Sequence, residues 1–89
     1  MRIWGKIFQE NHLLRDCVSE QTGSGRRTEM VMAALADICS QLDLQQPIWL
    51  KSNIRDFQKV GKTRFRADSF IEEIPFDYLE FQVIEEDEF

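Results

Sequence analysis

The chain has 89 residues, a net charge of −5 at pH 7 and a hydrophobic content of 43%. Such a length fits one small domain, and the apolar content is too high for a disordered segment. The negative charge argues against nonspecific attraction of the whole molecule to nucleic acid or to an anionic membrane surface. No apolar run reaches transmembrane length, and polar side chains interrupt the N-terminal stretch in which a secretory signal would be apolar. We therefore expect one cytoplasmic domain over residues 1–89, without a membrane partner and with a frayed acidic tail at 85–89.

The N-terminal residues alternate as a β-strand does. Ile3, Gly5 and Ile7 fall on one face, and the opposite face mixes charged and aromatic side chains. The stretch 10–12 predicts a turn, because Asn tolerates the left-handed backbone of tight hairpins. Residues 13–20 then return as a second, antiparallel strand, although neither of its faces is cleanly apolar.

A Gly- and Ser-rich connector at 22–25 leads into a helix, which the apolar spacing places at 27–42. Thr28 is the expected N-cap of this helix. Pro47 prevents the helix from continuing. The short apolar segment 48–50 is expected to pack on the sheet.

A second helix is expected to start with Ser52 or Asn53 as its N-cap and to end at Gly61. Its apolar stripe would consist of Ile54, Phe57 and Val60. The segment that follows, 62–68, fits either a loop or a short strand.

The C-terminal part predicts a strand at 70–74, a turn at 75–77 and a last strand at 78–86. The core-facing side chains of this last strand would be Leu79, Phe81 and Val83. The resulting order is strand, strand, helix, helix, strand, strand. It predicts an α+β fold, in which one antiparallel sheet of about four strands is covered by two helices.

The sequence shows no catalytic constellation. His12 is the only histidine, and it lies beside a predicted turn without a partner for acid–base chemistry. Cys17 and Cys39 have neither the number nor the spacing of a disulfide framework or a metal site, so we expect two free thiols in a reducing compartment. The acidic residues of the C-terminal strand alternate between two faces and do not converge as a Mg²⁺ or Ca²⁺ site requires. We therefore predict that the protein is not an enzyme and has no cofactor and no metal site.

The segment 22–28 superficially resembles a phosphate cradle, because a glycine-rich turn with two arginines leads into a helix N-terminus. It lacks the Gly-Lys-Ser/Thr ending of a P-loop, and no buried parallel strand is predicted before it. A flexible connector is the favoured interpretation.

Charge is polarised along the second half of the chain. Residues 51–66 carry six basic side chains and one acidic, whereas 68–89 carry nine acidic and none basic. The basic segment is the candidate anion or nucleic-acid patch, formed by Lys51, Arg55, Lys59, Lys62, Arg64 and Arg66. The competing interpretation is internal neutralisation, in which the last two arginines lie opposite acidic residues of neighbouring strands, namely Glu72, Glu80 or Glu85.

The leading hypothesis is a non-enzymatic protein–protein interaction or adaptor domain, which binds an unknown protein partner or associates with itself. The last strand is the candidate partner-facing element, with the outward side chains Tyr78, Glu80, Gln82 and Ile84. If this strand lies at a sheet edge, its unpaired backbone can accept a partner's strand. The second hypothesis is a nucleic-acid-binding accessory protein that uses the basic segment 51–66. A third, an enzyme with an unrecognised site, requires a concave pocket lined by convergent polar groups.

Three stretches of the sequence resemble a group of small uncharacterised bacterial proteins, namely 1–6 (MRIWGK), 47–50 (PIWL) and 76–87 (FDYLEFQVIEED). The resemblance spans nearly the whole chain. No activity is known for this group, so the resemblance implies a single bacterial cytoplasmic domain and nothing about chemistry.

Overall fold

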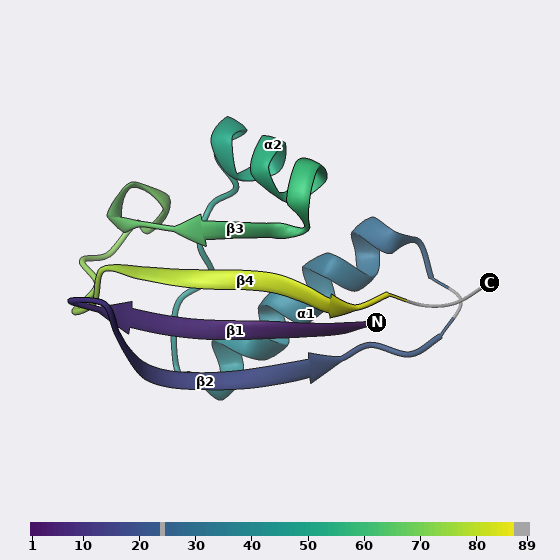
Figure 1. Cartoon of the computed structure of the whole chain (residues 1–89), viewed down its shortest axis with the longest axis horizontal. Coiled ribbons are helices and arrows are strands. Elements are labelled where there is room, and N and C mark those ends of the chain that lie inside the picture. Colours follow the sequence, from purple (N-terminus) through teal and green to yellow (C-terminus); the bar gives the residue numbers. More distant parts are fainter. Residues whose placement is uncertain (24, 87–89) are drawn as a thin grey trace.

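The computed structural model of the chain describes residues 1–23 and 25–86. Its elements in chain order are β1 (Arg2–Gln9), β2 (His12–Glu20), α1 (Arg27–Gln41), α2 (Lys51–Val60), β3 (Lys62–Phe65), the short 3-10 helix η1 (Ala67–Ser69) and β4 (Tyr78–Glu85). The four strands form one antiparallel sheet in the order β2-β1-β4-β3. Figure 1 shows α1 crossing one face of this sheet, while α2 lies beside β3. The α+β fold predicted from the sequence, with four antiparallel strands and two helices, is confirmed.

A tight turn joins β1 to β2. Gln9 pairs with His12, and the two residues between them, Glu10 and Asn11, have positive φ angles of 51° and 66°. Two consecutive residues of this kind form a turn whose twist matches that of the flanking strands. The predicted turn is confirmed, although His12 is already the first residue of β2.

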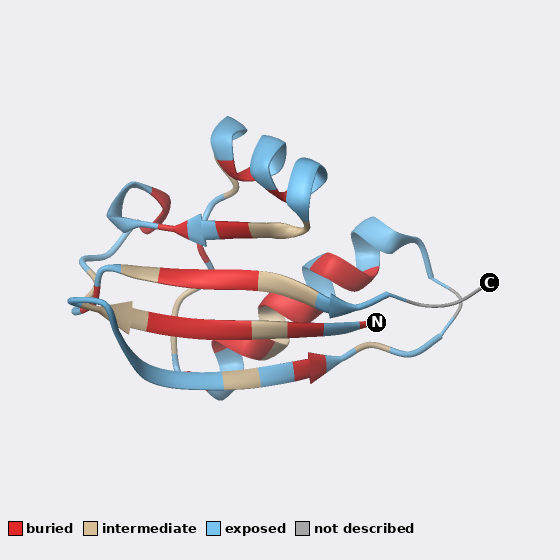
Figure 2. Ribbon diagram, in the orientation of Figure 1, coloured by how far each residue is buried: buried red, intermediate tan, exposed pale blue. Residues whose placement is uncertain are grey.

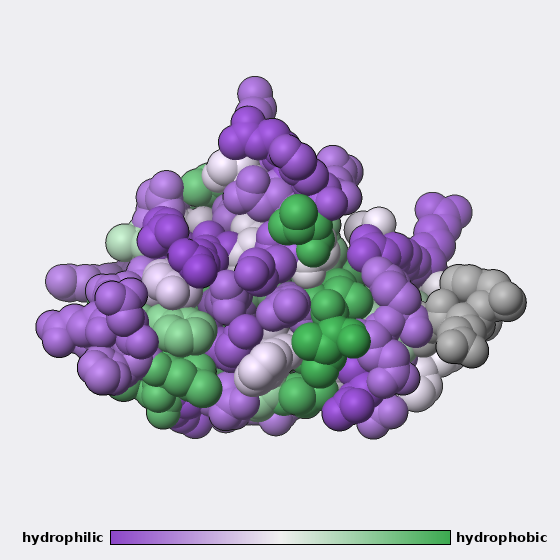
Figure 3. Space-filling model, in the orientation of Figure 1, coloured by the Kyte–Doolittle hydropathy of each residue, from purple (hydrophilic) through white to green (hydrophobic). Residues whose placement is uncertain are grey.

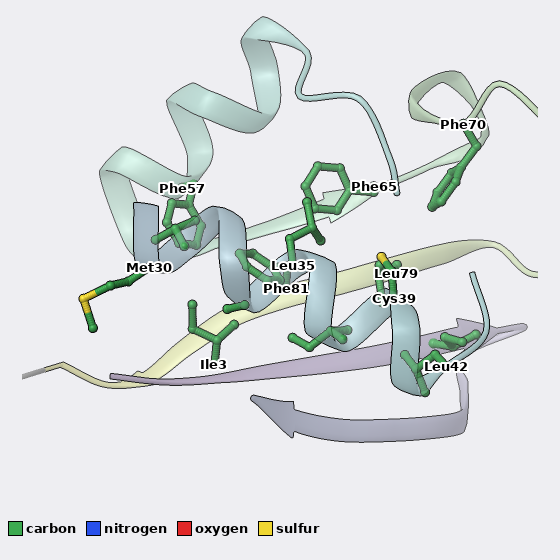
Figure 4. Close-up of a cluster of buried hydrophobic side chains, with 14 of the residues drawn as sticks. Ile3, Met30, Leu35, Cys39, Leu42, Phe57, Phe65, Phe70, Leu79 and Phe81 are labelled. Atoms are coloured by element: carbon green, nitrogen blue, oxygen red, sulfur yellow. The ribbon is translucent and has the colours of Figure 1, made fainter. Parts of the chain in front are cut away.

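The core lies between α1 and the covered face of the sheet. Figure 2 shows buried residues along the central strands β1 and β4 and along one side of α1. As the alternation predicted, Ile3 and Ile7 of β1 and Leu79 and Phe81 of β4 are buried. Figure 4 shows how side chains of the sheet meet those of α1, such as Leu35. One continuous core therefore joins the sheet to the helix.

The helix α1 passes directly over Gly5. A Cβ atom added at this position would lie 2.4 Å from Cγ2 of Ile38, well inside the contact distance of two carbon atoms. Ile38 itself is fully buried, so its side chain has no free space into which it can move. Gly5 therefore sets how closely β1 and α1 approach each other.

Both helices have N-caps other than those predicted. Arg26 is the N-cap of α1, and Thr28 lies inside the first turn, so the prediction of Thr28 as the cap is wrong. Leu50 is the N-cap of α2, and neither Ser52 nor Asn53 has that role. Asn53 acts from inside the helix instead, because its Oδ1 accepts the Leu50 backbone N–H at 3.0 Å. The backbone donor is thus satisfied from the third helical residue rather than from the cap.

The helix α2 exposes more of its apolar stripe than predicted. Phe57 is buried, but Ile54 and Val60 are 44% and 65% exposed. The reason is the position of α2 at the edge of the sheet, where only one side of the helix meets the core (Figure 2). The helix ends as predicted, because Gly61 adopts the left-handed conformation with a φ of 68°.

The segment 62–68, for which the sequence fits either a loop or a short strand, contains the strand β3 at Lys62–Phe65. The strand predicted at 70–74 is wrong, since this segment forms neither helix nor strand. Both sides of β4 are already occupied, by β1 and by β3, and no neighbour is left there for a further strand. Phe70 and Phe76 anchor the segment to the core instead, with ring centroids 6.0 Å apart.

Of the frayed acidic tail predicted at 85–89, the structure describes Glu85 and Glu86. Glu85 is the last residue of β4, and Glu86 forms an ion pair with Arg27 at 2.7 Å. Residues 87–89 lie outside the described residues.

Candidate interaction surfaces

The face of the sheet turned away from α1, which we call the open face, has no helix over it among the described residues. Figure 3 shows the molecule from this side, where most of the surface is hydrophilic and hydrophobic side chains form separate patches. The strand alternation and the ladder registers place on it Trp4, Lys6, Phe8, Lys62, Arg64, Tyr78, Glu80 and Gln82. The candidate partner-facing residues of β4 therefore share one face, except Ile84, which lies at a register shift and is 42% exposed.

Glu80 is the centre of a polar cluster on the open face. Its carboxylate lies 2.9 Å from Lys6 Nζ, 3.3 Å from Arg64 Nε and 3.9 Å from Lys62 Nζ. Glu80 is 4% exposed and Lys6 is 9% exposed, so both ions are nearly removed from water. Internal neutralisation therefore holds for Arg64, whose partner Glu80 is one of the acidic residues predicted to lie opposite it.

The ionisation of Glu80 follows from this cluster. Burial by itself raises the pKa of the carboxyl group, but the hydrogen bonds from Lys6 and Arg64 outweigh this effect. The pKa of Glu80 therefore lies below its usual value of 4.5. One carboxylate is shared by three cations, so the cluster keeps an excess of positive charge.

Aromatic rings surround this cluster. Phe8 and Tyr78 are stacked with centroids 5.3 Å apart, and the guanidinium groups of Arg64 and Arg66 lie 4.6 Å and 5.2 Å from the centre of the Tyr78 ring. On the other side, Trp4 donates from Nε1 to Asp16 at 2.8 Å and lies under the Lys6 ammonium at 3.9 Å. Such contacts hold long side chains in defined positions. Neither Lys6 nor the aromatic residues of β1 were among the predicted site residues, because their role depends on the neighbouring strand.

A cleft of about 490 Å³ lies beside the open face, between α2 and β3. The basic residues that line it are Lys59, Lys62, Arg64 and Arg66. Asp56 and Asp68 also line it and balance part of this charge. Among the described residues no ion pair is formed by Lys59 or Arg66, so the competing idea of internal neutralisation does not hold for Arg66.

The predicted basic patch is divided by the fold. Lys51 and Arg55 are exposed on α2 but do not line the cleft. The remaining four residues of the patch lie together at the cleft. Lys51, Arg55 and Lys59 follow one another at intervals of four residues and share one side of α2, but only Lys59, in the last turn, lines the cleft.

The edges of the sheet differ from those expected. The last strand, β4, lies inside the sheet and is paired on both sides, so it offers side chains but no free backbone to a partner. The edge strands are β2 and β3. Most of β2 is exposed, including Leu13 at 48%, Leu14 at 50% and Val18 at 38%. The mixed pattern of this strand in the sequence is the signal that matches its position at an edge.

The two cysteines are free thiols with little nucleophilic character. Burial raises the pKa of Cys39 to about 11. The pKa of Cys17 is also raised, first by burial and then by the nearby carboxylates of Asp37 and Asp16. A thiol nucleophile needs the opposite shift. In the part of the chain that the structure describes, no group of three His, Cys, Asp or Glu side chains converges as metal ligands would.

Comparison of the chain with protein-family models, with curated proteins and with solved structures finds no match. No helix within residues 1–23 and 25–86 has the length and apolar character needed to span a bilayer.

Proposed function

We propose that this chain is a non-enzymatic protein-interaction module that binds its partner by strand addition at the outer edge of β2. A partner strand needs a long edge with accessible backbone groups. β3 is four residues long and α2 lies beside it, whereas β2 is nine residues long and mostly exposed. The exposed edge of β2 is the observation that carries the proposal.

The backbone groups that point outward from β2 follow from the ladder with β1. Met1 and Gln21 exchange two backbone hydrogen bonds, at 2.8 Å and 3.0 Å. Such pairs recur at every second residue of an antiparallel ladder, so Cys17 and Ser19 direct their backbone groups to β1. The alternate residues of β2 direct their backbone N–H and C=O groups away from β1. We call these residues the outer row: Asp16, Val18 and Glu20.

The outer row is nearly free for a partner. Within the described part of the chain, the one hydrogen bond to its backbone comes from Gln41 Nε2, which donates to the Val18 carbonyl at the long distance of 3.4 Å. The exposed side chains of Leu13, Leu14 and Val18 add apolar area beside these backbone groups. A partner strand here gains main-chain hydrogen bonds together with burial of apolar surface.

Photo-crosslinking in a lysate of the source organism tests the proposal. A photoreactive residue at Leu14 should form discrete adducts, and the same residue at Ile71, which is 85% exposed on a loop, should not. Val18→Pro should abolish the Leu14 adducts, because it removes an outward N–H without touching the ladder to β1. Val18→Ala keeps that N–H and should retain them. Equal labelling at Leu14 and Ile71, or adducts that survive Val18→Pro, would overturn strand addition.

A reducing compartment such as the bacterial cytoplasm is the proposed location. Both thiols are free, as they are in a reducing compartment, and Cys39 is buried in the core.

A second candidate function, binding of single-stranded nucleic acid, is supported by the cleft between α2 and β3. Four cations line it, and Tyr78 presents a ring beside the two arginines. Guanidinium and ammonium groups bind the phosphates of a nucleic-acid backbone. Binding of a short labelled RNA or DNA should fall steeply with salt and fall further in Lys62→Glu or Arg66→Glu. Lys51→Glu lies outside the cleft and is the matched control. The absence of detectable binding at low salt would contradict this second candidate function.

A further inference from the structure

The edge of β3 that borders the cleft contributes backbone groups as well as side chains. Just before β3, the Val83 N–H donates to the Gly61 carbonyl at 2.9 Å. Bonded pairs of an antiparallel ladder recur at every second residue, so Thr63 directs its backbone groups to β4 and Arg64 directs its groups outward, toward α2 (Figure 1). The hydrogen bond from Asn53 Nδ2 of α2 to the Arg64 carbonyl, at 3.0 Å, agrees with this direction.

The Arg64 N–H is a donor without an acceptor. The carbonyl of the same residue is bonded to Asn53, but its N–H has no partner among the described residues. Asn53 is buried and also accepts the Leu50 N–H, so it fixes β3 against α2. Arg64 lines the cleft. A backbone donor is therefore held at the wall of the cleft, where an anion can accept its hydrogen bond.

Cations outnumber carboxylates at the cleft and in the Glu80 cluster beside it. The cations are Lys6, Lys59, Lys62, Arg64 and Arg66. The carboxylates are Asp56, Asp68 and Glu80. Five cations and three carboxylates leave a formal excess of two positive charges. Because Glu80 is the ion-pair partner of the other three cations, this excess lies on Lys59 and Arg66, which form no ion pair within residues 1–23 and 25–86.

The charge and the size of the cleft match a phosphate monoester on a small molecule. A phosphate monoester has a charge of about −1.5 to −2 near pH 7, whereas a phosphodiester has a single negative charge. The volume of about 490 Å³ lies within the range of pockets that bind small molecules. The carboxylates of Asp56 and Asp68 can accept hydrogen bonds from sugar hydroxyls. They would repel the further phosphates of a continuing strand.

We infer that the cleft binds the phosphate monoester of a nucleotide, with Lys59, Arg66 and the Arg64 N–H as the donors to the phosphate. The nucleotide is either free or the 5′-phosphorylated end of a strand, since both present the same group. Arg66 is suited to this role because its guanidinium, which lies 5.2 Å from the centre of the Tyr78 ring, can donate two parallel hydrogen bonds to phosphate oxygens. The inference deepens the second candidate function, on whose cleft it rests, and is independent of strand addition at β2.

Nuclear magnetic resonance titration of the isotope-labelled full chain, at constant ionic strength, tests the inference. The first probes are adenosine 5′-monophosphate, which should shift the Arg64 amide resonance saturably, and adenosine, which should not. In Lys59→Gln/Arg66→Gln the affinity for adenosine 5′-monophosphate should fall at least about tenfold. The matched control, Lys51→Gln/Arg55→Gln, removes the same charge outside the cleft and should change this affinity less than about twofold.

A second pair of probes distinguishes the two sources of the phosphate. Two short strands of one sequence carry either a 5′-phosphate or a 5′-hydroxyl. If strand ends bind, the phosphorylated strand should bind at least about fivefold more tightly than its 5′-hydroxyl counterpart. Binding of adenosine 5′-monophosphate without binding of either strand would support the inference for a free nucleotide and contradict the second candidate function.

Three results would overturn the inference. One is an Arg64 amide resonance that adenosine 5′-monophosphate leaves unchanged or shifts no more than adenosine does. Another is an equal loss of affinity in the two double variants, which would show general attraction of charge. The third is equal binding of the two strands, which would leave the second candidate function standing without a preference for the monoester. Circular dichroism of each variant establishes that a lost signal reflects binding rather than folding.

Discussion

Lys6 and Glu80 form an ion pair at 2.9 Å in the middle of a sheet face that no described helix covers. Their side chains are only 11% and 6% exposed. Trp4 lies 3.9 Å from the ammonium, and Gln82 accepts a hydrogen bond from it at 3.2 Å. The pair is therefore packed like a core contact, and part of the charge of the acidic C-terminal segment holds the sheet together.

Replacing Glu80 should be costly. We expect Glu80→Gln to lower the free energy of unfolding by about 2–4 kcal/mol, because the amide leaves the buried Lys6 ammonium without a counterion. Glu85→Gln is the control, since Glu85 and Arg2 form an exposed pair at 3.6 Å and should contribute less than about 1 kcal/mol. Urea unfolding at neutral pH measures both. Equal losses in the two variants would contradict a special role of the buried pair.

The same residue should make stability depend on pH. Because the folded chain holds the pKa of Glu80 below its usual value, the ionised group stabilises the fold above that usual value. This contribution is lost as the pH falls through the lowered pKa. The difference in unfolding free energy between the natural chain and Glu80→Gln should therefore be full at neutral pH and shrink in acid. A difference that stays constant down to about pH 3 would refute the assignment.

Gly5 should be intolerant of a side chain. Gly5→Ala places a methyl group against Ile38, and we expect a loss of about 1–3 kcal/mol. In an Ile38→Ala background the same change should cost less than about 0.5 kcal/mol, because the clashing group is gone. Gly25→Ala, whose added carbon meets nothing nearer than 3.5 Å, is the control and should be nearly neutral. Additive losses in the double variant would show that the two residues do not compete for space.

The thiols should react slowly with alkylating agents. Raised pKa values leave both cysteines mostly protonated near neutral pH, and thiolate is the reactive form. We expect Cys17 to react with iodoacetamide more slowly than a cysteine in an unfolded peptide, at a rate that increases with pH. Cys39, which is buried, should react only when the chain unfolds. Mass spectrometry of native and urea-treated protein distinguishes the sites, and equal native labelling of both would contradict this account.

Local patterns predicted much of the fold. The alternation of Ile3 and Ile7 identified the buried face of β1, and Gly61 marked the end of α2. Each of these features depends on residues close in the chain. Asn53 shows where such patterns fail, because its amide donates to the Thr63 hydroxyl and to the Arg64 carbonyl, while Oδ1 accepts the Leu50 N–H. A residue that resembled a cap is thus a buried link between α2 and β3.

The candidate surfaces depended on strand order, which no local pattern contains. With β4 at an edge, Tyr78 and Ile84 would have belonged to a docking strand, but β4 lies between β1 and β3. The polarised charge was visible in the sequence, yet its division into a buried ion pair and a partly balanced cleft required the register that places Arg64 opposite Glu80. Lys6 was missed for the same reason.

Residue-resolved hydrogen exchange tests the central claim, that the outer edge of β2 accepts a partner strand. In the isolated chain the amides of Cys17 and Ser19, which face β1, should exchange slowly, and those of Asp16, Val18 and Glu20 should exchange fast. In the complex recovered by the Leu14 crosslink, the three outer amides should become protected. Fast exchange at all three in a complex that protects another part of the chain would contradict the claim.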